Sequence, residues 1–471
     1  MNKYDIIIGI EIHIQMKTKS KMFSSAPSSF GREVNKEVDL YDFAFPGTLP
    51  TVNKEAVINA IRLANVLHMG IDDVLLFERK NYFYSDLPKG YQLTQQFRPL
   101  GKDGYLSIGD RNIKIERLHI EEDTCKQVHL FDRSLLDYNR AGIPLVEVVS
   151  RPDIKTAEEA AQYVEHIRSI VSFLGVSEGK MEEGSLRCDI NISLKDKNQN
   201  ELGTKVEIKN LNSISNIKKA INYEINRQSE LLDNGQLIKQ ETRRYDEANK
   251  KTVLMRIKID EIDYKCFTDP NIPPIHLSKE FIDNAISSSP ELAASKKARY
   301  ISLGLNEYDA SLLVSSKEVS DYFEKLISNN VNPKSAANWI NGEIQSYLNK
   351  IDISISDFKI KPERMAELLI LVETNKISIK QAREIFATML DDDRNLEKII
   401  TEKGLIQNNN EEDLKQTIAR ILDNNPKAIN DYKNGYDKAI GYLMGQVMKE
   451  TKGNANPSLA NKIIIEEISR R

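Results

Sequence analysis

Hydrophobic and polar residues alternate strictly near the start of the chain, and the period of two residues predicts a half-buried β-strand. The apolar positions are Ile8, Ile10, Ile12, Ile14 and Met16, and the positions between them are Gly9, Glu11, His13 and Gln15. Further strand-like runs follow at Tyr105–Ile108, Ile113–His119, Ile143–Val149, Leu186–Leu194, Thr204–Lys209 and Thr252–Ile259.

Three helical patterns interrupt these strands. The first covers Asn53–Met69 and stops at Gly70, and the third covers Ser215–Asp233. The second opens with Thr156 and Glu159, which have the spacing of a capping box, and ends at Gly175. Strands from distant parts of the chain with few helices between them favour an α+β domain over a doubly wound one.

The pattern becomes helical after about residue 293, with apolar positions at helical spacing. The helical segments are Pro290–Gly304, Tyr308–Asn329, Lys334–Lys350, Pro362–Glu373 and Ser378–Leu390. A polar joint at Asn408–Asn410 precedes a small helical tail whose last helix opens at Asn456-Pro457. We therefore predict three domains, at residues 1–292, 293–407 and 408–471.

Composition narrows the class of protein. The chain has 471 residues and a net charge of −4, from 66 Lys and Arg against 70 Asp and Glu. No apolar run approaches the ~20 residues of a membrane span, and the first residues do not have the pattern of a signal peptide. Three cysteines far apart argue against a disulfide framework. We expect a soluble cytoplasmic protein without a membrane association, and the charge balance alone does not indicate nucleic acid.

The common nucleotide-binding motifs are absent. The segment from Gly175 to Met181 is closest to a phosphate-binding loop, but it has one residue too few between the glycines. Met181 also stands where a Ser or Thr would hold Mg²⁺. A helix end followed by a turn explains this segment better, so any use of ATP would require a less common scaffold.

Two segments combine acids and an imidazole. Period-two geometry places Glu11 and His13 on one strand face, where they could bind a divalent cation or simply face water. Glu121, Glu122 and Asp123 follow an apolar strand, and three adjacent acids repel each other unless they are solvated or bind a cation. Both interpretations stay open for each segment.

Two later strands also place polar side chains on one face. These are Arg187, Asp189, Asn191 and Ser193 in one strand, and Lys205, Glu207 and Lys209 in the next. An acid between two lysines suits a site in which the acid binds Mg²⁺ and the ammonium groups bind phosphate. Ordinary ion pairing across the sheet surface is the alternative.

Basic and aromatic residues interleave from Arg79 to Gln92. This mixture can stack bases and hold backbone phosphate, although a packed loop would have the same composition.

Taken in order, these blocks resemble the B subunits of the bacterial and organellar aspartyl/glutamyl-tRNA amidotransferases. The matching elements are Gly9–His13, Lys21–Ser24, Phe45–Pro50 with Asn53, Arg79–Gln92, Leu118–Asp123, Asp137–Glu147 with Pro152-Asp153, Met181–Ser193, Thr204–Ser213 and Glu241–Tyr245, and near the C-terminus Gly441, Gly445, Lys449, Gly453, Asn456 and Pro457. The resemblance covers nearly the whole chain.

The resemblance implies a function and partners. Members of this family take up misacylated Glu-tRNA(Gln) or Asp-tRNA(Asn), phosphorylate the side-chain carboxylate with ATP, and amidate it with ammonia. The ammonia comes through a channel from a glutaminase, the A subunit, and the heterotrimer is completed by a small C subunit. The implied fold is a cradle-like, largely antiparallel catalytic domain, then a helical domain, then a small helical tail that grips tRNA.

The resemblance also implies roles for single residues. The metal-binding and catalytic positions are Glu11, His13, Glu122 and Glu207, with Glu121 as the alternative to Glu122 because neighbouring strand residues face opposite ways. Lys205 joins them as a catalytic residue, and Arg187, Asp189 and Lys209 are placed near the nucleotide or acyl-phosphate. Lys80, Tyr82, Tyr84 and Lys89 are placed at the channel mouth or the tRNA end. The implied cofactors are ATP and Mg²⁺.

The chain departs from the family pattern in places. Tyr41–Phe45 lacks the cysteines that many members carry there, so a zinc site is lost, and Asp263–Asn271 replaces a more aromatic family segment. Two other functions compete with the family one. A non-catalytic tRNA-binding scaffold predicts that Glu11, His13, Glu122 and Glu207 do not converge, and a metal-dependent hydrolase predicts no need for ATP or a glutaminase.

Overall fold

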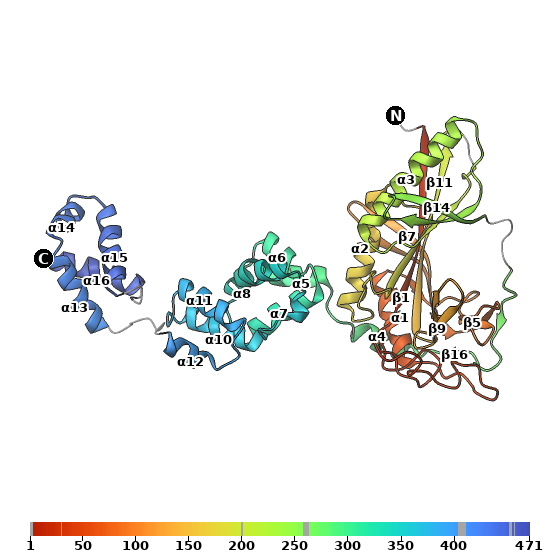
Figure 1. The fold of residues 1–471 in the computed structure, drawn as a ribbon, viewed down its shortest axis with the longest axis horizontal. Coiled ribbons are helices and arrows are strands. Elements are labelled where there is room, and N and C mark those ends of the chain that lie inside the picture. The colour runs from red at the N-terminus through yellow and green to blue at the C-terminus, as the bar shows by residue number, and fades with distance from the viewer. Residues whose placement is uncertain are drawn as a thin grey trace. The chain divides into compact units, whose positions relative to one another are not determined.

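The computed structural model describes residues 3–29, 31–198, 201–257, 263–403, 411–451, 455 and 457–471. The chain divides into two compact units, Met1–Ala293 and Ala294–Arg471. Figure 1 shows strands and helices together in the first unit and helices alone in the second. The predicted α+β class is therefore confirmed.

A large sheet organises the first unit. Within the described residues it has nine strands, in the order β14 (Lys251–Ile257), β13 (Glu241–Asp246), β12 (Val206–Lys209), β11 (Leu186–Asp196), β1 (Tyr4–Gln15), β10 (Pro144–Ser150), β7 (Arg111–Glu122), β6 (Gly101–Ile108) and β2 (Gly70–Ile71). All neighbouring strands are antiparallel except β12 and β13, which are parallel. The first strand of the chain therefore lies in the middle of the sheet.

Shorter strands form the remaining β-structure. They are β15 (Phe267–Thr268), β4 (Glu78–Asn81) and β5 (Tyr91–Thr94) in one small sheet, β16 (Ile275–His276) and β3 (Val74–Leu75) in a second, and the hairpin of β8 (Lys126–His129) and β9 (Ser134–Asp137). The hairpin connects β7 to β10, so it begins where the acidic segment Glu121–Asp123 ends.

Side-chain caps fix where the helices of this unit begin. Asn53, Thr156 and Ser213 accept backbone N–H bonds at the starts of α1 (Lys54–Val66), α2 (Ala157–Phe173) and α3 (Ile214–Asp233). A fourth helix, α4 (Lys279–Ser287), packs against α1. The three predicted helices are confirmed to within a few residues at their ends.

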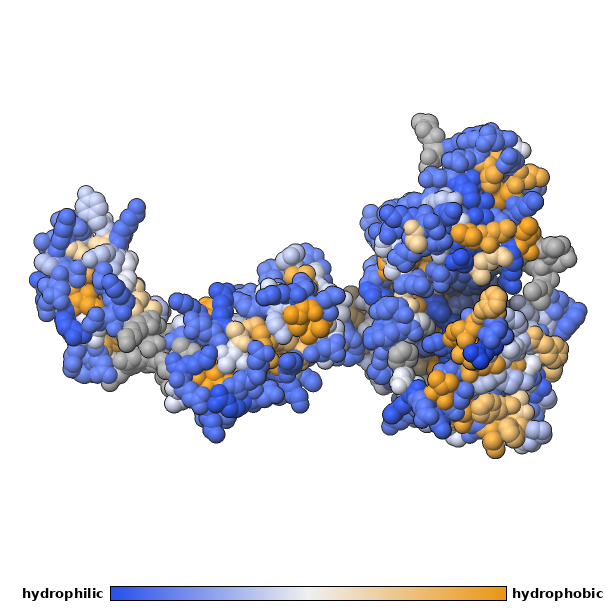
Figure 2. Space-filling view, in the orientation of Figure 1, coloured by the Kyte–Doolittle hydropathy of each residue, from blue (hydrophilic) through white to orange (hydrophobic). Residues whose placement is uncertain are grey.

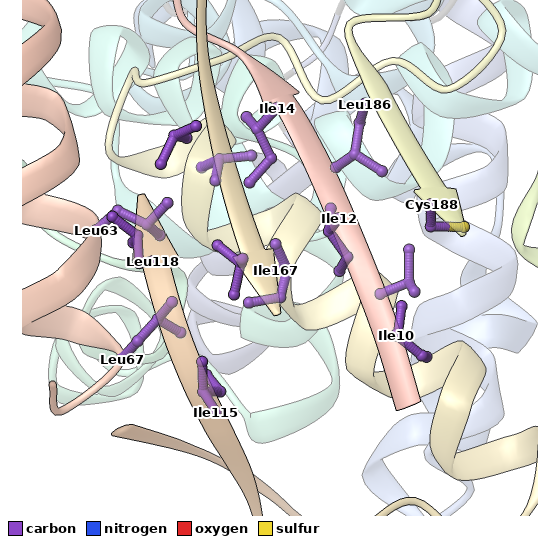
Figure 3. Close-up of a cluster of buried hydrophobic side chains, with 14 of the residues drawn as sticks. Ile10, Ile12, Ile14, Leu63, Leu67, Ile115, Leu118, Ile167, Leu186 and Cys188 are labelled. Carbon is purple, nitrogen blue, oxygen red and sulfur yellow. The ribbon is translucent and has the colours of Figure 1, made fainter. Parts of the chain in front are cut away.

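The apolar side of β1 lies in the main core. Ile8, Ile10, Ile12 and Ile14 are at most 1% exposed and pack with residues of α1, α2 and α3. Figure 3 shows Ile10, Ile12 and Ile14 beside side chains of α1 (Leu63, Leu67), α2 (Ile167), β7 (Ile115, Leu118) and β11 (Leu186, Cys188). The helices cover this face of the sheet, and the polar residues of β1 project from the other face.

The second unit is helical in its described part. Its elements are α5 (Ala293–Ser302), α6 (Glu307–Leu313), α7 (Lys317–Ser328), α8 (Pro333–Trp339), the π-helix η1 (Ile340–Ile344), α9 (Gln345–Ile351), the 3₁₀-helix η2 (Ile355–Asp357), α10 (Pro362–Glu373), α11 (Ile379–Met389), α12 (Leu396–Glu402), α13 (Glu411–Asp423), α14 (Pro426–Lys433), α15 (Lys438–Glu450) and α16 (Pro457–Arg470). One core joins residues from Tyr300 to Ile400, and another joins residues from Leu414 to Ile468.

One predicted helix is two helices in the structure. The apolar pattern predicts a continuous helix over Tyr308–Asn329, but Ser316 accepts the backbone N–H of Val319 and starts a new helix there. The joint at Asn408–Asn410, the positions Gly453 and Asn456, and the end of the strand predicted over Thr252–Ile259 lie outside the described residues. The domain boundary near residue 408 therefore stays a prediction.

The surface is mostly hydrophilic in the view of Figure 2, with patches of apolar residues. The hairpin β8–β9 contributes Val128, Leu130, Phe131 and Leu135, which are each more than 40% exposed. None of the helices in the described part of the chain has the length and apolar character that crossing a membrane requires.

We predict that Ile12→Ala destabilises the first unit by about 2–5 kcal/mol, because it leaves a cavity in the core between β1 and the helices. Urea unfolding measures the loss of stability, and hydrogen exchange of the backbone amides in the sheet shows that it affects the first unit. Phe131→Ala is the control, since Phe131 is fully exposed and its removal changes stability by less than about 0.5 kcal/mol. Equal losses in the two variants would contradict the assignment of β1 to the core.

Candidate active site on the polar face of the sheet

The polar face of the sheet carries a row of four charged or ionisable residues. In the strand register, His119 of β7 lies opposite Glu147 of β10, Glu147 lies opposite His13 of β1, and His13 lies opposite Arg187 of β11. Directly opposite residues share one face of a sheet and their side chains are in reach of each other. Two imidazoles, a carboxylate and a guanidinium from four neighbouring strands therefore lie in one row across the sheet.

Three residues on or beside this row can hold a metal ion. His13, Glu121 and Glu147 each offer one ligand atom, and these atoms lie within 4.8 Å of one another. We call them the metal triad. Carboxylates are the ligands that Mg²⁺ and Mn²⁺ prefer, and an imidazole is a common ligand of transition-metal ions. The donor set therefore fits a divalent cation.

His119 supports the metal triad from its side. Its Nε2 lies 3.2 Å from Glu147 and 3.6 Å from Glu121. The hydroxyl of Thr94 also donates to Glu121, at 3.3 Å. These partners hold both carboxylates in place, as outer contacts commonly do at metal sites.

Protonated imidazoles balance the charge of the acids. Burial alone would lower the pKa of His13 and of His119, but the charge of Glu147 and their hydrogen bonds to carboxylates outweigh it, so both pKa values are raised to about 9. Burial would raise the pKa of Glu147, and the two imidazoles instead hold it well below its usual range. The buried acids thus require positive charge, which a bound cation would also supply.

Glu122, predicted as a metal ligand, lies elsewhere. It follows Glu121 on β7, so its side chain points away from His13, and both of its oxygens lie 2.5 Å from the ammonium of Lys89. The backbone N–H of Leu93 also donates to it, at 3.1 Å. The structure therefore brings Glu121, the alternative, next to His13 and places Glu122 in a separate buried ion pair.

Glu11 and Glu207, the other predicted metal ligands, lie further along the same face. Glu11 accepts a hydrogen bond from the amide of Asn191, at 2.9 Å. Burial, reinforced by the charges of Glu147 and Asp189, raises the pKa of Glu11. Glu207 accepts from the hydroxyl of Thr242, at 2.7 Å. Neither residue belongs to the metal triad.

The predicted phosphate-binding residues are held by acids. Arg187 donates to Asp123 at 2.8 Å, and the amide of Gln15 donates to the same carboxylate at 2.7 Å. Lys209 pairs with Asp189 and lies 3.4 Å from Glu207. Burial alone would lower the pKa of Lys209, but these acids outweigh it and raise the pKa. The cations are thus oriented over the polar face before any ligand arrives.

Lys205 is exposed just before β12 and lines a pocket of about 230 Å³ beside Glu11. The sequence pattern predicts Lys205, Glu207 and Lys209 on one strand face, but β12 begins only at Val206, and Lys209 does not line this pocket.

The residues predicted for the channel mouth occupy one loop region. The ammonium of Lys80 lies 4.7 Å from the ring centre of Tyr264, and Tyr82 packs edge-on against the same ring. Lys89 is nearly buried and lies over the ring of Tyr41. Tyr84 is 58% exposed. The region therefore runs from the solvent to the buried Lys89–Glu122 pair.

The site also contains His119, Asp123 and Glu147, to which the sequence patterns assign no individual role. Glu147 stands alone between apolar residues of β10, and His119 and Glu121 have the two-residue spacing of one strand face. The isolated acid in an apolar strand and the two-residue spacing are local patterns, and they could have identified Glu147 and His119 as candidate site residues. The pairing of Glu147 with His13 could not be found in this way, because it depends on the register of two strands that are far apart in sequence.

Comparisons with known proteins cover nearly the whole chain. Residues 6–283 match the family model described as the GatB/GatE catalytic domain, and residues 321–468 match that of the GatB domain. The chain is 46% identical over 472 residues to the aspartyl/glutamyl-tRNA(Asn/Gln) amidotransferase B subunits of Bacillus cereus (strain AH187) and Bacillus mycoides (strain KBAB4), with 99% of each chain covered. The similarly named protein of Bacillus licheniformis is 46% identical over 474 residues, with 99% of this chain and 100% of its own covered.

We predict that Glu121→Gln weakens Mn²⁺ binding by about tenfold or more, because it removes a charged ligand from the metal triad. Glu122→Gln is the matched control, since it alters the neighbouring acid but not the metal triad. Titration calorimetry of the purified protein measures both. A larger loss in Glu122→Gln than in Glu121→Gln would contradict the site.

We also predict that the metal-free protein loses stability as the pH rises from about 6.5 to 9. The pKa values of His13 and His119 are raised on folding, so the folded state binds more protons in this window. The contribution of the two protonated imidazoles to folding stability is complete below pH 6.5 and is lost as the pH rises through 9. Urea unfolding at several pH values measures it, and Glu147→Gln should flatten the dependence. An unchanged slope in that variant would contradict the role of Glu147.

Proposed function

The chain belongs to the family of aspartyl/glutamyl-tRNA(Asn/Gln) amidotransferase B subunits, and we propose on this premise that its polar sheet face amidates the side-chain carboxylate of Glu-tRNA(Gln), Asp-tRNA(Asn) or both. The observation that carries the proposal is the 46% identity over 99% of the chain, which includes every strand of the site. The enzyme is an ATP-dependent, glutamine-hydrolysing ligase that supplies Gln-tRNA(Gln), Asn-tRNA(Asn) or both for protein synthesis in the cytoplasm.

The reaction requires an activated carboxylate, because a carboxylate is a poor electrophile. One oxygen of the aminoacyl side chain attacks the γ-phosphorus of ATP, and ADP leaves. Ammonia then attacks the carbonyl carbon of the acyl-phosphate and loses a proton, and inorganic phosphate leaves with the former carboxylate oxygen. The product is the side-chain amide, still esterified to tRNA.

We assign Mg²⁺ to His13, Glu121 and Glu147, on the support of their close ligand atoms. When bound, the cation would offset the charge of the ATP phosphates. His119 stays outside the ligand set and holds the two carboxylates by hydrogen bonds. A bound cation would therefore compensate the charge of Glu121 and Glu147 even when the imidazoles are neutral.

Arg187 and Lys209 are assigned to the phosphate groups. Their ion pairs with Asp123 and Asp189 hold the cations on the same face as His13. Fixed cations stabilise a charge that develops in the transition state without having to reorganise. Glu207, on the same strand as Lys209, lies 3.4 Å from its ammonium, and the hydroxyl of Thr242 on β13 donates to Glu207.

The ammonia is assigned to a separate glutaminase chain, with a small third chain in the complex. The support is the exposed apolar surface beside the site. Phe83 is 93% exposed, and the hairpin β8–β9 is joined to this loop because Tyr138 and Gln127 donate to Ser85. Exposed apolar surface of this kind is typical of a contact with a partner. Lys80, Tyr82, Tyr84 and Lys89 belong to the same segment of the chain as Phe83 and are assigned to the ammonia route or the tRNA end.

The C-terminal tail is assigned to tRNA binding. Its helices α13, α15 and α16 share a core of their own, which leaves their outer faces available for RNA. The net charge of the whole chain hides such a role, because lysines at selected positions can contact phosphate while acids elsewhere cancel their sum.

The direct test is amide formation on misacylated tRNA. We expect the chain, assembled with its glutaminase and small partner chains, to convert Glu-tRNA(Gln) to Gln-tRNA(Gln) only when ATP, Mg²⁺ and glutamine are present. Glu147→Gln should lower kcat by at least about 100-fold, because it removes a charged ligand and its ion pairs with His13 and His119. Asp5→Asn, at the exposed start of the same strand as His13, is the control.

Product formation without ATP would favour a hydrolase or a different ligase chemistry and would overturn the proposal. Full activity of Glu147→Gln would leave amidation intact and overturn the metal assignment alone.

A further inference from the structure

A buried ion pair lies outside the site described above. Lys21 lies in the connection between β1 and α1, and among the described residues it is the one lysine with no exposed surface. Its ammonium is 3.0 Å from the carboxylate of Asp42, whose side chain is 1% exposed. A side chain enclosed to this degree cannot touch a substrate, so any role of Lys21 in the reaction passes through the groups that it holds.

Lys21 joins three segments of the chain. Its ammonium also donates to the backbone carbonyl of Tyr138, at 3.1 Å, in the connection between β9 and β10. The backbone N–H of Met22 donates to the carbonyl of Gly142 in the same connection, at 2.7 Å. There is no spare room, because a Cβ on Gly142 would lie 2.9 Å from Oδ1 of Asp42 and 3.3 Å from Cδ of Lys21. The three segments therefore close tightly around the buried pair.

Asp42 fixes a turn that carries Tyr41. The backbone N–H of Asp39 donates to the Asp42 carboxylate at 2.9 Å, and the N–H of Tyr41 donates to the Asp39 carboxylate at the same distance. The N–H of Ala44 closes the turn on the carbonyl of Tyr41, at 3.0 Å. Aspartate side chains commonly fix turns in this way. The ion pair with Lys21 therefore sets where the backbone of Tyr41 lies.

The ring of Tyr41 covers the ammonium of Lys89. Tyr41 is buried, and its ring centre lies 4.5 Å from that ammonium. On its other contacts the ammonium meets Glu122, both of whose oxygens are at 2.5 Å. An aromatic face stabilises an ammonium that has lost its water. Tyr41 is thus one wall of the buried Lys89–Glu122 pair.

Burial opposes the charge of Lys21 and lowers its pKa, although Asp42 acts in the opposite direction. A buried ion pair is weak evidence for added stability, because apolar side chains of the same volume often stabilise a core as well. Apolar side chains would not replace the bonds of Asp42 to the turn, however. The pair therefore specifies one position of the turn.

We propose that the Lys21–Asp42 pair is a positioning element of the ammonia route, which holds the ring of Tyr41 against Lys89 and so keeps the Lys89–Glu122 pair closed to solvent. The inference rests on the proposed function, which assigns Lys89 to the ammonia route or the tRNA end, and it selects the ammonia route. Lys21, Asp42 and Tyr41 touch neither ATP nor tRNA in this account.

A closed wall matters for ammonia in particular. Ammonia released by the glutaminase is small and neutral, and it escapes wherever the route opens to water. With the Tyr41 ring displaced, the Lys89–Glu122 pair would contact solvent and ammonia would be lost before it meets the acyl-phosphate. The defect would affect ammonia delivered from glutamine, and not ammonia supplied from solution.

The test compares two ammonia donors on the assembled heterotrimer. We expect Lys21→Met, which keeps the length of the side chain but not its charge, to lower glutamine-dependent amidation of Glu-tRNA(Gln) by about tenfold or more. Amidation with saturating ammonium chloride should stay close to wild type, and more glutamate should be released per Gln-tRNA(Gln) formed. Lys17→Met is the matched control, since Lys17 precedes Lys21 in the same connection and is exposed.

Variants of Tyr41 test the same wall with the ion pair intact. Tyr41→Leu should reproduce the loss with glutamine alone, because it removes the ring over Lys89, and Tyr41→Phe should keep most of the coupling, because it retains the ring. An equal loss with both donors in Lys21→Met and Tyr41→Leu would show a structural role only and would overturn the proposal. Unchanged glutamate release per amide in Tyr41→Leu would overturn it as well.

This failure differs from failure of the proposed function. A wild-type complex that formed no amide on Glu-tRNA(Gln) with ATP and ammonium chloride would refute the function itself. A wild-type complex that amidates, with variants that lose no coupling, refutes only the role of Lys21, Asp42 and Tyr41.

Discussion

A slip of β1 by one residue would turn its isoleucines to solvent and bury Glu11 and His13 among apolar side chains, because side chains alternate strictly along a strand. Each buried isoleucine contributes about 1.5–3 kcal/mol relative to exposure. Ile8, Ile10, Ile12 and Ile14 therefore hold the strand in one register against α1, α2 and α3. The same register places His13 between Glu147 and Arg187, so the packing of the core determines the geometry of the site.

Charge compensation is the second requirement of this face. Glu147 is buried and contacts both His13 and His119, while Asp123 is buried beside Arg187. A buried carboxylate without a partner is strongly destabilising, so each acid is retained together with a cation. Glu147, His13 and Arg187 lie opposite one another across β10, β1 and β11, so these acids and cations form one charge network.

Much of the architecture follows from the sequence because it depends on local patterns. The alternation in β1 and the caps at Asn53, Thr156 and Ser213 are local, and the α+β class follows from them. The break at Ser316 is also local but was missed, because the apolar pattern continues across it. The choice between Glu121 and Glu122 depends on how β7 pairs with β10, and Glu147 depends on how β10 pairs with β1. These are long-range registers, which a single sequence does not display.

We place the cation site of an ATP-dependent amidation at His13, Glu121 and Glu147. The decisive measurement is a crystal structure of the protein with Mn²⁺ and a non-hydrolysable ATP analogue, using the anomalous signal of manganese. We expect a manganese peak within coordination distance of His13, Glu121 and Glu147, with the phosphates on the side of Lys209 and Arg187. A peak coordinated by Glu11 and Glu207 instead, with none at the metal triad, would contradict this placement.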